Sequence, residues 1–254
     1  MNGYRQIFPG LFTMGNLFCG FASILVSVQG ENLTEAAWLI IFASFFDFLD
    51  GLVARLSKGA SRFGVELDSL TDMVSFAVAP AVLLYSFKMI GFGNWGWFLG
   101  FTFIMAGAFR LARFNLDVKL ETKGSFLGLP VPVAAVAIAS FVIFCDHLWG
   151  EIRLDRFLAI MIILFSALMV STIEYETMPR FDFSIRKNRI KLIILLGAGL
   201  LLTIQTRLVM FPMVVLYILW GIFKLVLGLI AKNGSNDRVK TKKFIKNEKN
   251  QRIK

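Results

Sequence analysis

The chain has few charged residues for its length and almost no cysteine or histidine. Asp, Glu, Lys and Arg make up 17% of its 254 residues, whereas ordinary soluble domains contain roughly 25%. Two cysteines are too few for a disulfide scaffold. Cys19 and Cys145 both lie in apolar stretches, so we predict that they are packing residues and form neither a disulfide nor a metal site.

Apolar residues are correspondingly abundant. Hydrophobic residues make up 57% of the chain, with 27 phenylalanines, and the mean hydropathy is +0.70. A soluble core of this size cannot bury so much apolar surface, so the composition predicts an all-α integral membrane protein and excludes intrinsic disorder. Eight stretches are apolar and long enough to span a bilayer. They are residues 9–29, 35–56, 67–90, 95–114, 130–148, 156–173, 190–206 and 208–231.

The formal net charge of +10 is distributed unevenly between the two sides of the predicted membrane. Most Lys and Arg residues precede the first span, follow the even-numbered spans or lie in the C-terminal tail. The opposite side holds only Lys88, Arg153, Arg156 and Arg207. Positive charge marks the cytoplasmic side, so we expect a multi-pass protein of the cytoplasmic membrane with both termini in the cytoplasm. The basic residues are spread over loops and tail, and we expect no nucleic-acid partner.

Four aspartates lie inside predicted spans, where ionisable groups are costly and therefore indicate function. Asp47 and Asp50 are near the cytoplasmic end of the second span, and Asp68 and Asp72 are near the cytoplasmic start of the third. At 100° per residue, each pair lies within about 60° on its helix. Bringing the two faces together would place four carboxylates in one cavity at one depth, and the active site would open to the cytoplasm.

Four carboxylates in such a cavity repel one another unless cations neutralise them. Oxygen ligands without nearby Cys or His suit Mg²⁺ or Mn²⁺, with Ca²⁺ also compatible, and four carboxylates are enough for two ions. A two-metal site favours displacement at phosphorus. The alternative is that the aspartates form ion pairs with Arg55 and Arg62, but two bases leave the four acids partly uncompensated.

The spacing of these residues resembles the signature of the CDP-alcohol phosphotransferase family, D-x-x-D-G-x-x-A-R-x8-G-x-x-x-D-x-x-x-D. The matching positions are Asp47, Asp50, Gly51, Ala54, Arg55, Gly64, Asp68 and Asp72. The resemblance implies a six-helix core and transfer of a phosphatidyl-type group from a CDP-linked lipid to an alcohol, with release of CMP. It implies that the four aspartates bind metal and that Asp72 is also the general base. Gly51, Ala54, Arg55 and Gly64 would line the CDP site.

The family core divides the chain into three parts. Residues 1–176 would be the six-helix catalytic core, and residues 177–231 a cytoplasmic loop and two additional C-terminal spans. Residues 232–254 would be a basic, disordered tail. This tail either attracts anionic lipid head groups or fixes the topology, and the sequence does not separate the two.

Two further stretches bear on the acceptor alcohol. Residues 9–20, together with R-x-x-R-F-N from Arg110 and F-x-G-L-P-x-P from Phe126, are similar to the membrane-type phosphatidylserine synthases of this family. That similarity implies CDP-diacylglycerol and L-serine as substrates. An acceptor or phosphate site is predicted at Arg62, Arg110, Arg113 and Asn115. The alternative for Arg110 and Arg113 is ordinary positive-inside anchoring.

Thr13 and Asn16 are polar residues in the first span and are assigned to the nucleotide site or, equally, to bonds between helices. Three other readings of the whole chain stay open. The acceptor could be glycerol 3-phosphate or an inositol phosphate, and the donor could be an archaeal CDP-lipid. A divalent cation transporter is disfavoured because no acidic path continues across the membrane. A homodimer is neither required nor excluded.

Overall fold

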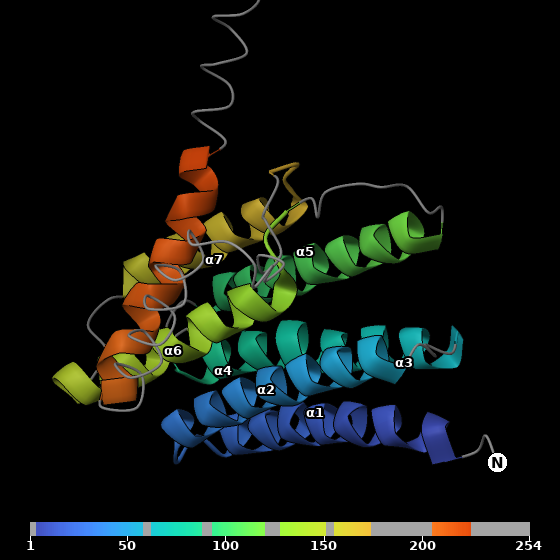
Figure 1. Cartoon of the computed structure of the whole chain (residues 1–254). Coiled ribbons are helices and arrows are strands. Elements are labelled where there is room, and N and C mark those ends of the chain that lie inside the picture. The colour runs from blue at the N-terminus through green and yellow to red at the C-terminus, as the bar shows by residue number, and fades with distance from the viewer. Residues whose placement is uncertain are drawn as a thin grey trace, which may run out of the picture.

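The computed structural model describes residues 4–57, 62–87, 93–119, 128–150, 155–173 and 205–224. Within these ranges every regular element is a helix, as predicted (Figure 1). The elements are α1 (Tyr4–Gln29), α2 (Leu33–Ser57), α3 (Arg62–Asp72), the π-helix η1 (Met73–Val78), α4 (Ala79–Phe87), α5 (Asn94–Lys119), α6 (Val131–Trp149) and α7 (Asp155–Val170). A further helix, Gln205–Lys224, follows.

The helices form a bundle with the third span at its centre. α1 packs along α2 on one side and α5 packs along α7 on the other (Figure 1). Between them, α3, η1 and α4 form one continuous span that contacts both α1 and α5. The acidic motif runs through α2 and this central span, so the core of the bundle holds the candidate site in place.

Six of the described helices are long and apolar enough to cross a membrane, and the chain is a multi-pass membrane protein. They are Gly10–Gln29, Leu33–Val53, Phe63–Phe87, Asn94–Leu116, Val131–Trp149 and Gln205–Lys224, with the shorter apolar helix Phe157–Val170 beside them. The first six predicted spans are therefore found as helices, although the third starts at Arg62 rather than residue 67.

The last predicted span, residues 208–231, is found in its described part as the helix Gln205–Lys224, which starts three residues earlier than predicted. Most of the predicted seventh span, and the basic tail, lie outside the described residues.

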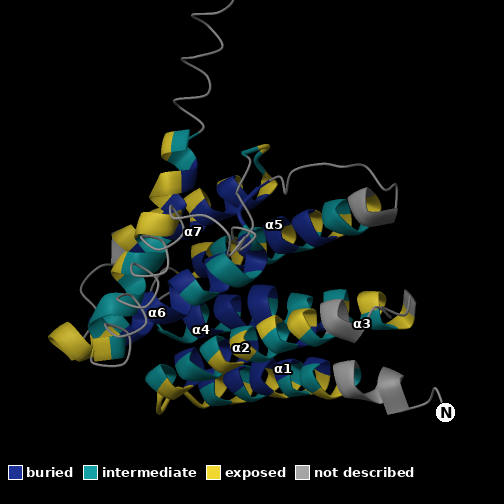
Figure 2. Cartoon of the chain, in the orientation of Figure 1, coloured by how far each residue is buried: buried dark blue, intermediate teal, exposed yellow. Residues whose placement is uncertain are grey.

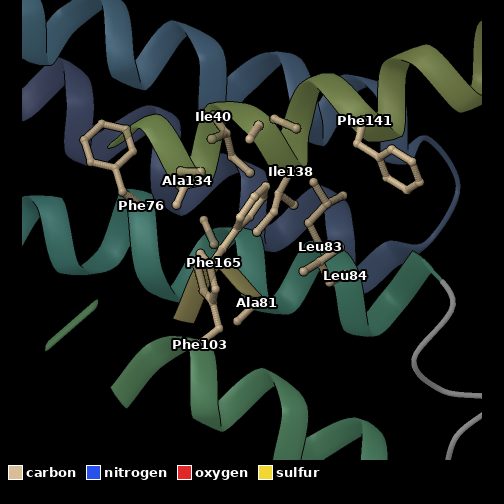
Figure 3. Close-up of a cluster of buried hydrophobic side chains, with 14 of the residues drawn as sticks. Ile40, Phe76, Ala81, Leu83, Leu84, Phe103, Ala134, Ile138, Phe141 and Phe165 are labelled. Carbon is tan, nitrogen blue, oxygen red and sulfur yellow. The ribbon is translucent and has the colours of Figure 1, made fainter. Parts of the chain in front are cut away.

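Buried positions lie inside the bundle and exposed positions lie on its outside (Figure 2), where many large apolar side chains are exposed. Phe18 is 68% exposed, Leu70 67% and Ile160 63%. Such exposure is unfavourable in water but favourable in lipid. In the interior, Phe76, Phe103 and Phe165 interlock with alanines of α4 and α6 (Figure 3). The two cysteines are buried and unbonded, which confirms their predicted packing role.

α1 lies close to the central span at Gly20. A Cβ built on Gly20 would lie 2.7 Å from the Cα of Ser75, which is closer than real Cβ contacts. Ser75 also donates a hydrogen bond of 3.1 Å from its Oγ to the backbone carbonyl of Asn16, one turn earlier on α1. Small residues at such crossings let helix backbones approach each other in membranes. Gly20 therefore sets the distance between α1 and the aspartates of the central span.

We expect Gly20→Ala to destabilise the fold by about 1–3 kcal/mol, because the backbone of η1 must move to admit the methyl group. The measurement is unfolding in detergent, followed by fluorescence. Gly10→Ala on the same helix is the matched control, since no described atom lies within 4 Å of its added Cβ. Equal stability of the two variants would contradict the close approach.

Candidate active site

α2 and the central span bring three of the four motif aspartates together. Asp47, Asp68 and Asp72 each offer a carboxylate oxygen, and these oxygens lie within 4.8 Å of one another. All three residues are half-buried. α3 starts only five residues after α2 ends, which keeps the acidic ends of the two helices close. The two predicted pairs therefore come together, with three of the four aspartates in one group.

The fourth aspartate, Asp50, is buried next to this group and is held by α1. Its carboxylate accepts a hydrogen bond from the Thr13 hydroxyl. Its charge acts on Asp47 and on Asp68, so it belongs to the same electrostatic environment. Its role as a metal ligand stays a prediction.

Asn16 lies one turn after Thr13 on α1 and contacts the central span. Its Nδ2 donates a 3.3 Å hydrogen bond to Oδ1 of Asp72. Thr13 and Asn16 thus each donate a hydrogen bond to one motif aspartate. This is the bonding between helices that the sequence allowed as one of two alternatives. The contact with a nucleotide remains a prediction. The side chain of Asn16 is fully buried, and its Oδ1 has no hydrogen-bond partner among the described residues.

Gly51 borders open space beside Asp50. A Cβ built on this residue would meet no described atom within 4 Å, so the space is large enough for a ligand to approach the backbone. Gly64 lies on α3 one turn before Asp68. These two glycines are consistent with a CDP site but do not establish it. The side chains of Ala54, Arg55 and Arg62, which were assigned to that site or to phosphate, lie outside the described residues.

The two arginines of α5 are placed differently, although they are one helical turn apart. Arg110 is 8% exposed and interacts electrostatically with Asp72. Its guanidinium carbon lies 5.8 Å from the ring centroid of Phe114, a cation–π distance. The Nε of Arg110 has no hydrogen-bond partner among the described residues. This arginine faces the acidic group.

Arg113 instead binds the end of α7. Its Nη1 donates to the carbonyl of Val170 and its Nη2 to that of Ser171, both at 3.2 Å. The amide of Gly128 also donates to this end of the chain, to Ile173 at 2.8 Å. Gly128 has φ +84°, and an added Cβ would overlap the Met169 carbonyl. Arg113 of the R-x-x-R stretch and Gly128 of the G-L-P stretch are therefore close in space. Their separation in the sequence gives no sign of this contact.

Asn115 supports the helix that carries the acids. Its Nδ2 donates to the Oγ of Ser69 at 3.0 Å, and that hydroxyl donates its own proton to the backbone carbonyl of Val65 at 3.1 Å. Ser69 stands between Asp68 and Asp72 on α3. Sequence reasoning missed Ser69, because a serine at an unspecified motif position carries no signal of its own.

The acidic group fits a hard divalent cation. Its ligand atoms are carboxylate oxygens, and no Cys or His joins Asp47, Asp68 and Asp72 in the part of the chain that the structure describes. Three half-buried carboxylates this close repel one another, and a bound cation would remove that repulsion. The site can therefore hold a metal ion and present it to a phosphate.

Comparison with known proteins gives one family. The sequence model of the family described as "CDP-alcohol phosphatidyltransferase" matches residues 6–173. The CDP-diacylglycerol–serine O-phosphatidyltransferase of Helicobacter pylori is 35% identical over 181 residues, which cover 71% of this chain and 76% of that protein.

Two other relatives extend the comparison. The archaetidylserine synthase of Methanothermobacter thermautotrophicus is 41% identical over 177 residues, covering 68% of this chain and 70% of that one. The CDP-diacylglycerol–serine O-phosphatidyltransferase of Bacillus subtilis is 37% identical over 131 residues, covering 51% and 72% respectively. The matched region contains α1 to α7 and every candidate site residue. The chain therefore belongs to the CDP-alcohol phosphatidyltransferase family.

Proposed function

We propose that the protein transfers the phosphatidyl group of CDP-diacylglycerol to the hydroxyl of L-serine and releases CMP. The observation that carries the proposal is the group of Asp47, Asp68 and Asp72 with oxygens within 4.8 Å, placed on the motif of the family. The choice of serine is supported by the names of the relatives, which act on serine in bacteria and form archaetidylserine in an archaeon.

Two divalent ions, Mg²⁺ or Mn²⁺, would be held by Asp47, Asp50, Asp68 and Asp72. Bound there, they would supply positive charge to the attacking and leaving oxygens of a displacement at phosphorus. The nucleotide would lie in the open space beside Gly51. The acyl chains would lie against the exposed apolar side chains of the bundle, in the membrane.

Asp72 is the proposed general base. It would take the proton of the serine hydroxyl, and the oxygen would attack the phosphorus attached to the lipid. Asn16 holds the carboxylate of Asp72 through its amide, which fixes its orientation. We favour direct attack over a covalent intermediate. The Ser69 hydroxyl lies in the same stretch, but it bonds Asn115 and the carbonyl of Val65.

The position of the site in the membrane follows from sequence charge. Arg55, Lys58 and Arg62 lie between the two acidic halves of the motif, and basic residues of this kind favour the cytoplasmic side. We propose that the protein lies in the cytoplasmic membrane with its termini and active site in the cytoplasm, where a soluble acceptor such as serine is available. Residues 1–176 would be the catalytic core, and Gln205–Lys224 belongs to the part added after it.

Purified protein supplied with CDP-diacylglycerol, Mg²⁺ or Mn²⁺ and a panel of acceptors tests the proposal. We expect CMP release with L-serine and formation of phosphatidylserine. CMP release only with glycerol 3-phosphate or an inositol phosphate would replace the acceptor and keep the family chemistry. Use of an archaeal CDP-lipid alone would replace the donor. Divalent metal flux into liposomes without any CMP release would contradict the enzyme and favour a transporter.

A further inference from the structure

Two buried polar atoms on residues that interact with Asp72 lack partners among the described residues. They are Oδ1 of Asn16, whose side chain is 0% exposed, and Nε of Arg110, whose side chain is 8% exposed. Leaving such atoms unsatisfied is costly, and native proteins seldom do it without a reason. Asn16 hydrogen-bonds Asp72, and Arg110 interacts with it electrostatically. The two unsatisfied atoms therefore belong to one place, next to the proposed base.

Three other buried side-chain atoms in the described residues also lack partners, but they are hydroxyls of Ser27, Thr71 and Ser166. A hydroxyl on a helix reaches a carbonyl of its own preceding turn by rotating one torsion angle. The amide oxygen of Asn16 and the Nε of Arg110 cannot form such a hydrogen bond within their own helix. Asn16 and Arg110 thus need an external partner, and the helix hydroxyls do not.

The two atoms have opposite hydrogen-bonding character. An ionised Asp72 only accepts, so the Asn16 amide must direct Nδ2 to it, and its free atom is the accepting oxygen. Arg110 carries a permanent positive charge and its free atom donates. A ligand that satisfies both has an anionic group for Arg110 and a hydrogen-bond donor for Asn16. A free α-amino acid carries these two groups on one carbon atom.

We propose that Asn16 and Arg110 form the subsite for the acceptor's amino-acid portion. Arg110 binds the carboxylate, Oδ1 of Asn16 accepts a hydrogen bond from the ammonium group, and the side-chain hydroxyl then reaches Asp72. This proposal rests on the proposed function, because it presumes a zwitterionic acceptor. It favours a hydroxy amino acid, whose ammonium group donates to Asn16 as a cation, over a phosphorylated alcohol, which could donate there only through a neutral hydroxyl.

The neighbouring arginine is unsuited to this role. Arg113 already donates to the carbonyls of Val170 and Ser171, which hold it at the end of α7. Arg110 is fixed against the Phe114 ring, and its electrostatic partners include Tyr217 of the helix Gln205–Lys224. The guanidinium of Arg110 is thus positioned beside Asp72 before a ligand arrives.

Two serine analogues test the assignment. Ethanolamine lacks the carboxylate and 3-hydroxypropionate lacks the ammonium group, and each is measured as a competitor of serine in the CMP-release assay. We expect Arg110→Gln to raise the KM for serine roughly 100-fold, as loss of a buried charge partner does. The inhibition constant of ethanolamine should stay within about threefold of its wild-type value, because ethanolamine makes no bond to Arg110.

For Asn16→Leu we expect the reverse pattern. The affinity for serine should fall to that for 3-hydroxypropionate but stay above that for ethanolamine. kcat should also fall, because Asp72 loses its hydrogen bond. Arg110→Lys keeps the charge and should recover part of the serine affinity. The KM for CDP-diacylglycerol should not change in the Arg110 variants. Ser27→Ala, which removes an unpartnered hydroxyl on the same helix as Asn16, is the control and should change nothing.

A uniform loss of affinity for serine and both analogues would overturn the subsite, since a purely structural role affects all three alike. Unchanged serine KM in Arg110→Gln would overturn it as well. Failure of the proposed function looks different, because the wild-type protein itself would then release no CMP with serine.

Discussion

Asp72→Asn is expected to lower turnover by roughly 1000-fold or more while most of the CDP-lipid affinity survives. The amide has the shape of the carboxylate and keeps an oxygen for Asn16, but it cannot take a proton from the acceptor hydroxyl. A positioned general base contributes about 10²–10⁴-fold to a rate. The measurement is CMP release under saturating substrate, paired with equilibrium binding of the CDP-lipid.

Asp146→Asn provides the matched control. Asp146 ends α6 and accepts a 2.8 Å hydrogen bond from Thr34, at the other end of α2 from the acidic group. The same change of chemistry at this exposed site should leave turnover within about twofold, in line with surface substitutions. Near-wild-type turnover in Asp72→Asn would show that another group takes the proton.

Removal of divalent metal is expected to abolish turnover, and Mg²⁺ or Mn²⁺ is expected to restore it. The oxygens of Asp47, Asp68 and Asp72 lie within 4.8 Å of one another, so the metal-free site holds unbalanced negative charge. Metal should also stabilise the fold, by ~2.7 kcal/mol at a concentration 100 times its Kd. The unfolding temperature in detergent, with and without metal, measures this effect without relying on catalysis.

Asp68→Asn should reduce that metal-dependent rise in unfolding temperature, because one ligand of the group is lost. Asp146→Asn again serves as the control, since this residue is outside the group. Full turnover after thorough chelation would rule out a metal requirement. If adding metal does not change the unfolding temperature, binding at the acidic group is ruled out.

Helical periodicity and the cost of burying charge in lipid were enough to predict which aspartates face the site. The spacing puts Asp68 and Asp72 on one face of α3, and the shared depth of Asp47 makes its meeting with them favourable. The environment of Asp50 could not be predicted in this way. Its hydrogen bond to Thr13 depends on how α1 packs on α2, which no spacing within one helix reveals.

The arginines of α5 show the same limit. Their spacing places Arg110 and Arg113 one turn apart, which made them equivalent candidates for an anion. Arg113 takes a different partner because the end of α7 and Gly128, both distant in the sequence, come to rest beside it. Packing between distant segments, rather than residue type, separates the two roles.

The π-helix η1 begins directly after Asp72 and has a further consequence. A π-helical stretch contains a residue more than the α-helix that could replace it, so it accommodates that residue with little change in the rotational phase between the two halves of the central span. Losing one residue from Met73–Val78 would let the stretch close as an α-helix and would keep Asp68 and Asp72 aligned with the buried Leu83 and Leu84. Losing one residue from the α-helical part, Ala79–Phe87, would instead turn the acidic face by about 100° relative to the packed residues that follow the deletion.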